Sequence, residues 1–168
     1  MILTKSEILS LLKSTPPLIE GYMDLTKQLQ PAGFDLTLRS VHVFESGGTI
    51  DFDNTRRVIP QWKELPFRKD SSVFLDPGAY VVSFNEIVNI PLNLVAIAKP
   101  RSSLLRSGAT VSTAVWDPGY RGRSKALLVV YNSHGLTLYK NARIVQLIFI
   151  KLTGEVLEGY AGVYQGET

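Results

Sequence analysis

The sequence predicts a single, mainly β domain, and three observations support this fold class. Eight short segments rich in Val, Ile, Leu and Tyr lie between residues 34 and 152, with Gly, Pro or Asn between them. The 168 residues are 45% apolar and 20% charged, which is typical of one domain with its own core. Cysteine is absent, so this core must form without disulfides. Many short strands at this spacing indicate a sandwich, a jelly roll or a barrel.

The strands are expected where apolar and β-branched residues alternate with polar ones between turn residues. Each segment is short, and a Gly, Pro or Asn lies near its ends. The expected strands are 34–38, 41–44, 72–75, 79–84, 94–98, 109–115, 125–132 and 143–152.

Two short helices interrupt this β pattern. Near the N-terminus, Thr4 is the predicted N-cap, and Glu7 three residues later completes a capping box before an apolar stripe. Pro16 ends this helix, because proline cannot continue the backbone hydrogen bonding. The second helix is expected within 101–108, where two serines begin it and a glycine can end it.

The C-terminal end differs in composition from the rest of the chain. Residues 159–168, GYAGVYQGET, contain three glycines and few apolar side chains. Such a segment buries little surface, so we expect a domain at 1–158 followed by a flexible tail.

The charge distribution limits the classes of partner. The net charge is +3 and the basic residues are scattered, which does not resemble the dense basic stripe of a nucleic-acid-binding protein. The exception is the group Arg121, Arg123 and Lys125, which is either a solvated turn or part of a phosphate site. No apolar run approaches the length of a membrane span, and the N-terminus lacks secretory-signal features. We therefore expect a cytoplasmic protein with neither a nucleic-acid nor a membrane partner.

Several chemistries are excluded by composition. The two histidines, His42 and His134, cannot build a zinc deaminase site without cysteine. No glycine-rich phosphate loop of the mononucleotide or dinucleotide type occurs. The serines at 102 and 103 have no histidine nearby in sequence to form a catalytic triad with them.

The remaining candidates are carboxylates, and side chains that can donate hydrogen bonds to phosphate, on a β scaffold. Asp35 lies within a predicted strand, Asp117 at the end of another, and Gln146 within an otherwise apolar one. Arg101, with the two serines after it, opens the short internal helix and can donate to phosphate. Each of these residues also has a purely structural interpretation as an ion-pair partner, a cap or a surface residue.

Four segments together resemble the motifs of the trimeric dUTPase and dCTP deaminase superfamily. They are LQPAGFDLTL, PRSSLLRSG, AVWDPGYRG and NARIVQLIF, and they occur in the order and at the spacing of that family. The opening MILTKSEIL resembles the start of the deaminases. The resemblance covers nearly the whole chain and implies a β-clip, or distorted jelly-roll barrel, in a homotrimer with shared active sites. It also implies dUTP as substrate and Mg²⁺ as cofactor.

The resemblance assigns roles to individual residues. Asp117 would activate the attacking water, Tyr120 would lie against the deoxyribose, and Asp35 would hold Mg²⁺ through water. The backbone of 113–116 and of the strand after Gly122 would contact the uracil edge. The phosphate-binding residues would be Arg101, Ser102, Ser103, Arg106 and Gln146, and the tail tyrosines Tyr160 and Tyr164 would close over the base.

The tripeptide Asp-Pro-Gly occurs twice, once beginning at Asp76 and once at Asp117. The segment at Asp76 resembles a structural hairpin of the family, so we expect Asp76 to be a turn residue and Asp117 to be the catalytic one.

The superfamily contains two reactions, and the residues after the third motif distinguish them. The deaminases need a glutamate on the following strand to transfer protons, but no Asp or Glu occurs from Pro118 through Gly154. We therefore expect hydrolysis of dUTP to dUMP and pyrophosphate. One alternative is a dCTP deaminase, either alone or bifunctional with dUTP hydrolysis, and Arg106 favours it. The other alternative is a nucleotide-binding regulator without catalysis.

Overall fold

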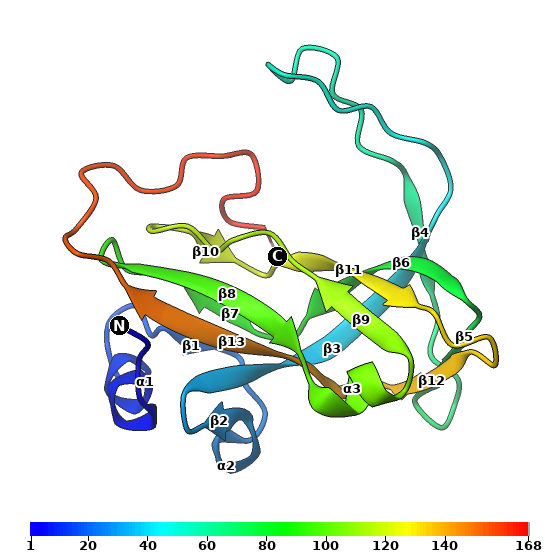
Figure 1. Cartoon of the computed structure of the whole chain (residues 1–168), viewed down its shortest axis with the longest axis horizontal. Coiled ribbons are helices and arrows are strands. Elements are labelled where there is room, and N and C mark those ends of the chain that lie inside the picture. The colour runs from blue at the N-terminus through cyan, green and yellow to red at the C-terminus, as the bar shows by residue number, and fades with distance from the viewer. Residues whose placement is uncertain (168) are drawn as a thin grey trace.

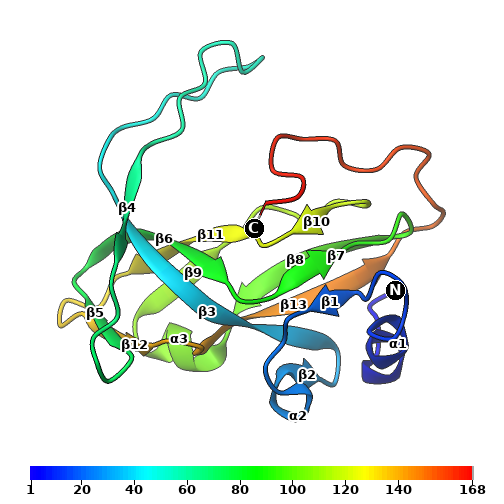
Figure 2. The ribbon, with the colours of Figure 1, turned by 180° about the vertical axis from the view of Figure 1, so that it is seen from behind.

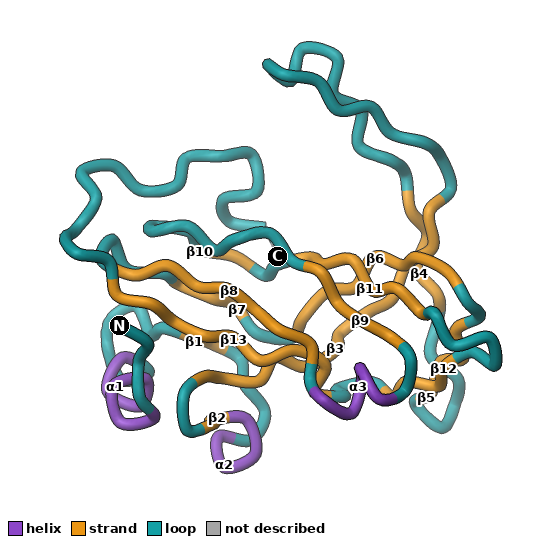
Figure 3. Tube along the Cα trace, in the orientation of Figure 1, coloured by secondary structure: helices purple, strands orange, loops and turns teal. Residues whose placement is uncertain are grey.

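The computed structural model describes residues 1–167 and confirms the mainly β fold class (Figures 1–3). Its largest sheet has the strand order β8-β13-β3-β6-β11-β9, in which every pair is antiparallel. These strands are β3 (Gly33–Phe44), β6 (Gly78–Phe84), β8 (Leu94–Pro100), β9 (Ala109–Ser112), β11 (Lys125–Val130) and β13 (Arg143–Lys151). All eight strand segments expected from the sequence are present, with 34–38 and 41–44 joined into the single strand β3.

Short elements surround this sheet. β2 (Leu29–Gln30) and β4 (Trp62–Leu65) add to β3. A three-stranded sheet contains β1 (Ile19–Glu20), β7 (Ile87–Asn89) and β10 (Arg121–Gly122), and a two-stranded sheet contains β5 (Ser72–Leu75) and β12 (Leu136–Tyr139). Most of these elements are too short, or too polar, to be predicted from periodicity.

The three helices are short. α1 (Lys5–Leu11) begins with the predicted capping box, because Thr4 N donates to Glu7 Oε2 at 2.8 Å and the Thr4 hydroxyl accepts from Glu7 N. α3 (Ser102–Arg106) is the predicted internal helix, and α2 (Leu25–Gln28) was not expected. None of the helices in residues 1–167 is long and apolar enough to cross a membrane.

The Asp-Pro-Gly at Asp76 forms an exposed bend between β5 and β6, but the hairpin expected there was wrong. β5 before it pairs with β12, whereas β6 after it pairs with β3 and β11. Asp76 is exposed and makes one recorded contact, its carbonyl accepting from the Tyr80 hydroxyl at 2.8 Å. The bend therefore passes the chain from one sheet to another.

The core lies around β3 and β13, whose inward side chains are fully buried. Phe34, Leu36, Leu147 and Phe149 each have no exposed surface. Residues 33–38 are buried at every position, so this part of β3 is covered on both faces. A polar residue placed here therefore needs partners within the protein.

A buried carboxylate joins the N-terminal segment to this core. Glu86 has no exposed surface and accepts from Thr37 N, the Thr37 hydroxyl and Gln28 Nε2 at 2.6–2.9 Å. Burial raises the pKa of Glu86, although these three hydrogen bonds oppose the shift. Glu86 and Gln28 therefore have an architectural role, linking α2, β3 and the turn after β6.

A long loop between β3 and β4 extends away from the body of the molecule (Figures 1 and 2). Residues 45–61 form this arm, and the Thr49–Val58 pairing closes it. Phe52 at its tip is fully exposed, and Ile50 is mostly so.

Candidate active site

A cavity of about 580 Å³ lies where β11, the 113–120 segment, the base of the arm and the C-terminal tail meet. Its wall includes Asp117, Tyr120 and Lys125 from the middle of the chain and Tyr160 and Glu167 from the tail. Asp117 is exposed, so its carboxylate is accessible to a molecule in the cavity. Asp117 and Glu167 are the only carboxylates among the described residues of this wall.

Local backbone geometry positions Asp117. Trp116 and Ala96 of β8 exchange two backbone hydrogen bonds of 3.0 Å, and Tyr120 N donates to the Asp117 carbonyl at 3.1 Å. Gly119 has φ +81°, a conformation that favours glycine. A Cβ there would also lie 2.7 Å from the Gly159 Cα, so this glycine permits both the turn and the close approach of the tail.

Tyr120 is held rigidly in the same wall. It is 7% exposed, and its hydroxyl lies 3.1 Å from the Ser124 Oγ, which also accepts from Trp116 Nε1 at 2.6 Å. Burial raises the pKa of Tyr120, which keeps its hydroxyl neutral. The ring of Tyr160 packs edge-on against Tyr120 at a centroid distance of 5.5 Å.

The tail folds back over this segment through hydrogen bonds more than through burial (red in Figure 1). Tyr160 N donates to the Pro118 carbonyl at 2.7 Å, and Gln165 bonds both to the Gly119 carbonyl and to Arg121 N at 2.9 Å. Glu167 forms an ion pair with Lys125. Tyr164 also lines the cavity, so both predicted tail tyrosines reach it. The flexibility of the tail stays a prediction.

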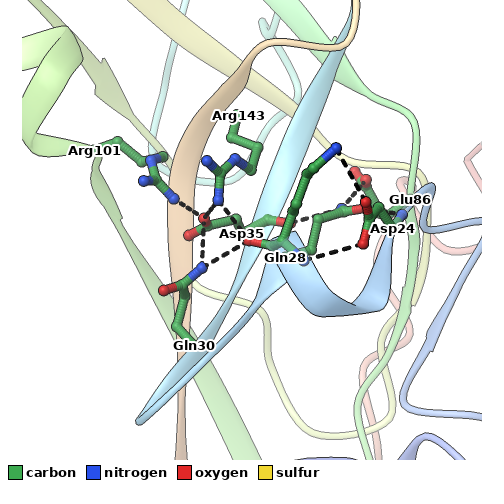
Figure 4. Close-up of polar contacts among 8 residues, drawn as sticks. Asp24, Gln28, Gln30, Asp35, Glu86, Arg101 and Arg143 are labelled. Carbon is green, nitrogen blue, oxygen red and sulfur yellow. Dashed lines mark hydrogen bonds and ion pairs between the residues drawn. The ribbon is translucent and has the colours of Figure 1, made fainter.

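A second cluster of polar residues surrounds Asp35 (Figure 4). Asp35 has no exposed surface, and its Oδ2 accepts from Gln30 Nε2 at 3.0 Å and Arg143 Nη1 at 3.2 Å while forming an ion pair with Arg101. Burial, and then the nearby Arg143 charge, lower the pKa of Arg101. Asp35 Oδ1 is buried and has no hydrogen-bond partner among residues 1–167.

Strand register brings Gln146 into this cluster. Gln146 pairs with Asp35 of β3 on one side and with Lys99 of β8 on the other, so the three side chains lie on one face of the sheet. Gly33 leaves room for this arrangement, because a Cβ there would lie 2.8 Å from Gln146 Nε2.

The remaining predicted phosphate-binding residues lie beside this cluster. Ser102, Ser103 and Arg106 are exposed on α3, which begins directly after Arg101. Their side chains make no recorded hydrogen bonds within the described part of the chain, which leaves them available for a ligand.

One chain does not bring the two groups of site residues together. Trp116 pairs with Ala96 of β8. Lys99, which stands at the level of Gln146 and Asp35, follows Ala96 three residues later, roughly 10 Å further along the strand. Asp117 and Tyr120 therefore line one end of the sheet, while the Asp35 cluster lies toward the other.

The sequence analysis did not select Gln30, Ser124, Arg143 or Glu167 for this site, and it left Lys125 as part of either a solvated turn or a phosphate site. Arg143 could have been found, because it stands in the fourth motif, NARIVQLIF. Ser124 follows the third motif closely but carries no pattern of its own. Nothing in the sequence indicates that Glu167 reaches the cavity.

Fold and site together define a member of the dCTP deaminase-like family, and the chain belongs to it, because the family's sequence profile matches residues 2–152. Three archaeal proteins are similar to it. The chain is 56% identical over 166 residues to a probable deoxyuridine 5'-triphosphate nucleotidohydrolase of Methanosarcina mazei, covering 99% of this chain and 97% of the relative. A protein of the same description from Archaeoglobus fulgidus is 48% identical over 99% of this chain and 96% of its own. The deoxyuridine 5'-triphosphate nucleotidohydrolase of Methanocaldococcus jannaschii is 42% identical over 83% of this chain and 88% of its own.

A solved structure supports the fold alone. The 2'-deoxycytidine 5'-triphosphate deaminase of Agrobacterium tumefaciens has a TM-score of 0.65 and 23% identity over 88% of this chain. The match spans about half of that protein, 47% of its chain.

We predict that Asp35→Asn lowers the free energy of unfolding by about 2–3 kcal/mol. Breaking a fully buried ion pair costs ~3–5 kcal/mol, and the loss here should be smaller because both arginines keep some solvent access. Urea unfolding would measure the change in the free energy of unfolding. The matched control, Asp76→Asn in the exposed bend, should stay within about 0.5 kcal/mol of wild type. Equal effects from the two substitutions would contradict the assigned role of Asp35.

Proposed function

We propose that this protein hydrolyses dUTP to dUMP and pyrophosphate. The observation that carries the proposal is the exposed Asp117 carboxylate in a cavity walled by Tyr120 and by a strand, β11, that has no carboxylate. The names of the archaeal relatives support the same reaction.

Asp117 acts as the general base in this proposal. Its carboxylate orients a water molecule and accepts its proton as the oxygen attacks the α-phosphorus, and the bond to the pyrophosphate leaving group then breaks. The rigid turn at Gly119 fixes the direction of the carboxylate, and the buried Tyr120 ring provides a flat surface for the deoxyribose. The backbone of 113–116 contacts the uracil edge.

Arg101, Ser102, Ser103, Arg106 and Gln146 bind the triphosphate. Arg143 joins them, because it shares Asp35 with Arg101. Asp35 orients both guanidinium groups, and each retains donors for phosphate oxygens. These side chains neutralise charge that the triphosphate carries in the transition state.

Asp35 fits a magnesium site only if a water molecule lies between its carboxylate and the ion. Its free Oδ1 can accept from a water ligand of Mg²⁺, but two arginines engage Oδ2, and no group of three acidic or histidine side chains gathers within residues 1–167. When bound with the triphosphate, Mg²⁺ would supply further neutralisation of phosphate charge.

The complete site requires more than one subunit. The roughly 10 Å between the two groups of residues along β8 exceeds the distance from a nucleotide's α-phosphorus to its own phosphate tail. We therefore propose a homotrimer in which the Asp117 half of one subunit faces the Asp35–α3 half of another. We place the protein in the cytoplasm, where its substrate occurs.

The tail is the proposed lid of this site. Tyr160 and Tyr164 close over the bound nucleotide and exclude water, and the Lys125–Glu167 ion pair holds the closed position.

Deamination of dCTP is the second candidate, alone or with hydrolysis. Glu167 favours deamination, because this tail residue brings a carboxylate into the cavity, whereas β11 has none. Its ion pair with Lys125 weighs against it, since a glutamate held by an ammonium group is a poor proton carrier.

We predict that wild-type protein releases pyrophosphate from dUTP without releasing ammonia from dCTP, and that Asp117→Asn lowers the rate by about 10²–10⁴-fold. Asparagine preserves the shape of the side chain but cannot accept the proton. Coupled pyrophosphate and ammonia assays would measure both reactions. Asp76→Asn is the control and should retain activity, and ammonia released as fast as pyrophosphate would overturn the assignment.

Shared sites predict complementation between two inactive variants. Asp117→Asn disables one half, and Ser103→Asp disables the other by placing a negative charge among the phosphate ligands. A mixture refolded from equal amounts of the two variants should recover about a quarter of wild-type activity, because random assembly pairs the intact halves at that frequency over all trimers. Mixtures that stay inactive, or an active monomer in sedimentation, would show that each chain holds a complete site.

Removing residues 159–168 should lower kcat/KM for dUTP by about one to two decades, because stacking and closure are lost. Unfolding temperature and oligomeric state serve as controls for the fold. Unchanged kinetics in the truncated protein would show that the tail is no lid.

A further inference from the structure

A second cavity, of about 320 Å³, lies on the β3–β6 side of the sheet and is lined mainly by polar and basic residues. Four of its residues are cationic, namely Arg39, Arg123, Lys125 and Lys140, and one, Glu64, is acidic. Except for Lys125, none of these residues lines the catalytic cavity.

Strand register builds the floor of this cavity. Ser40 of β3 pairs with Ser83 of β6, and Ser83 pairs with Lys125 of β11, so these three side chains form a row on one face. The two serine oxygens lie 2.5 Å apart. The register of β3 shifts between Leu38 and Ser40, which places Arg39 at an irregularity beside the row.

Three of the four basic groups form no ion pair within the described part of the chain. Arg39, Arg123 and Lys140 form no ion pair with a carboxylate among residues 1–167, whereas six other pairs occur there. Burial, and then the charge of Arg39, lower the pKa of Arg123, while the charge of Glu86 opposes this shift, so the two guanidinium groups repel each other and Glu86 offsets part of that repulsion. An anion between them would relieve this repulsion.

Buried donor capacity remains at the same place. Arg123 Nη1 donates to the carbonyls of Phe84 and Asn85, which fixes the guanidinium group, while Arg123 Nε is buried without a partner among the described residues. His42 Nδ1 is also buried without a partner among the described residues, and it can donate only in the tautomer that carries its proton. A buried polar atom without a partner is costly, so a ligand that accepts hydrogen bonds would stabilise this arrangement.

We infer that this cavity binds a small multivalent oxyanion of the phosphate class, for which inorganic diphosphate has the appropriate charge. Arginine forks match phosphate oxygens in geometry, Lys140 adds a point charge, and the paired serines can donate from the floor. Lys125 lines both cavities and holds Glu167 of the tail, so an anion here competes with the tail carboxylate for the same ammonium group. The binding itself does not depend on the proposed reaction.

Calorimetric titration of the full chain with sodium pyrophosphate, in a metal-free buffer of low salt, tests this inference. Replacing two exposed cations, in Arg39→Gln/Lys140→Gln, should weaken binding by about tenfold or more. Lys13→Gln/Lys69→Gln is the matched control, because it removes the same charge from exposed positions outside the cavity. Ser103→Asp should not affect this site.

Loss of affinity confined to the Arg39/Lys140 variant supports the site. Equal loss in the control would mean general charge attraction, and loss with Ser103→Asp but not with Arg39/Lys140 would assign the anion to α3. Either result, or no binding at millimolar pyrophosphate, would overturn the inference. A parallel titration with orthophosphate distinguishes a diphosphate site, which binds it at least about tenfold more weakly, from a monophosphate site.

Discussion

The burial of one charge, that of Asp35, constrains much of this structure. It lies in the part of β3 that is covered on both faces, where an ionised group persists only with close partners. Those partners come from three other places in the chain, namely Gln30 in β2, Arg101 before α3 and Arg143 at the start of β13. The ion pairs therefore hold together β3, β13 and the start of α3, which carry the proposed phosphate ligands. Because the guanidinium groups remain partly exposed, they can satisfy Asp35 and still face solvent.

The same sheet separates the proposed base from the proposed phosphate ligands. β8 connects them, with Trp116 bridged to it near one end and Arg101 following the other. A strand is stiff, so the two groups cannot approach each other within one chain without breaking the ladder between β8 and β13. In the proposed homotrimer, each half-site would meet its complement on a neighbouring subunit.

The tail shows how a segment with little apolar surface can still hold a defined position. Gln165, Gly166 and Glu167 bond to the backbone or side chains of residues 119–125. Such polar contacts each contribute little net stability, which would allow the proposed lid to open and close. Lys125 is central here, because it lines both cavities, and its ammonium group links the tail to the basic cavity beside β3.

The sequence alone determined the local structure and the chemistry of the motifs. Thr4 and Glu7 predicted the first helix, alternation predicted the strands of the large sheet, and the four motifs contained Asp35, Asp117 and the phosphate-type donors before any contact was known. The tertiary structure decided which residues meet. In the tertiary structure β5 pairs with β12 instead of β6. Arg143 contacts Asp35, 108 positions away in the sequence, and Glu167 contacts Lys125, 42 positions away. The physical reason is that caps, turns and periodicity depend on neighbours within a few residues, whereas ion pairs between distant segments depend on strand order and register, which only the packed sheet defines.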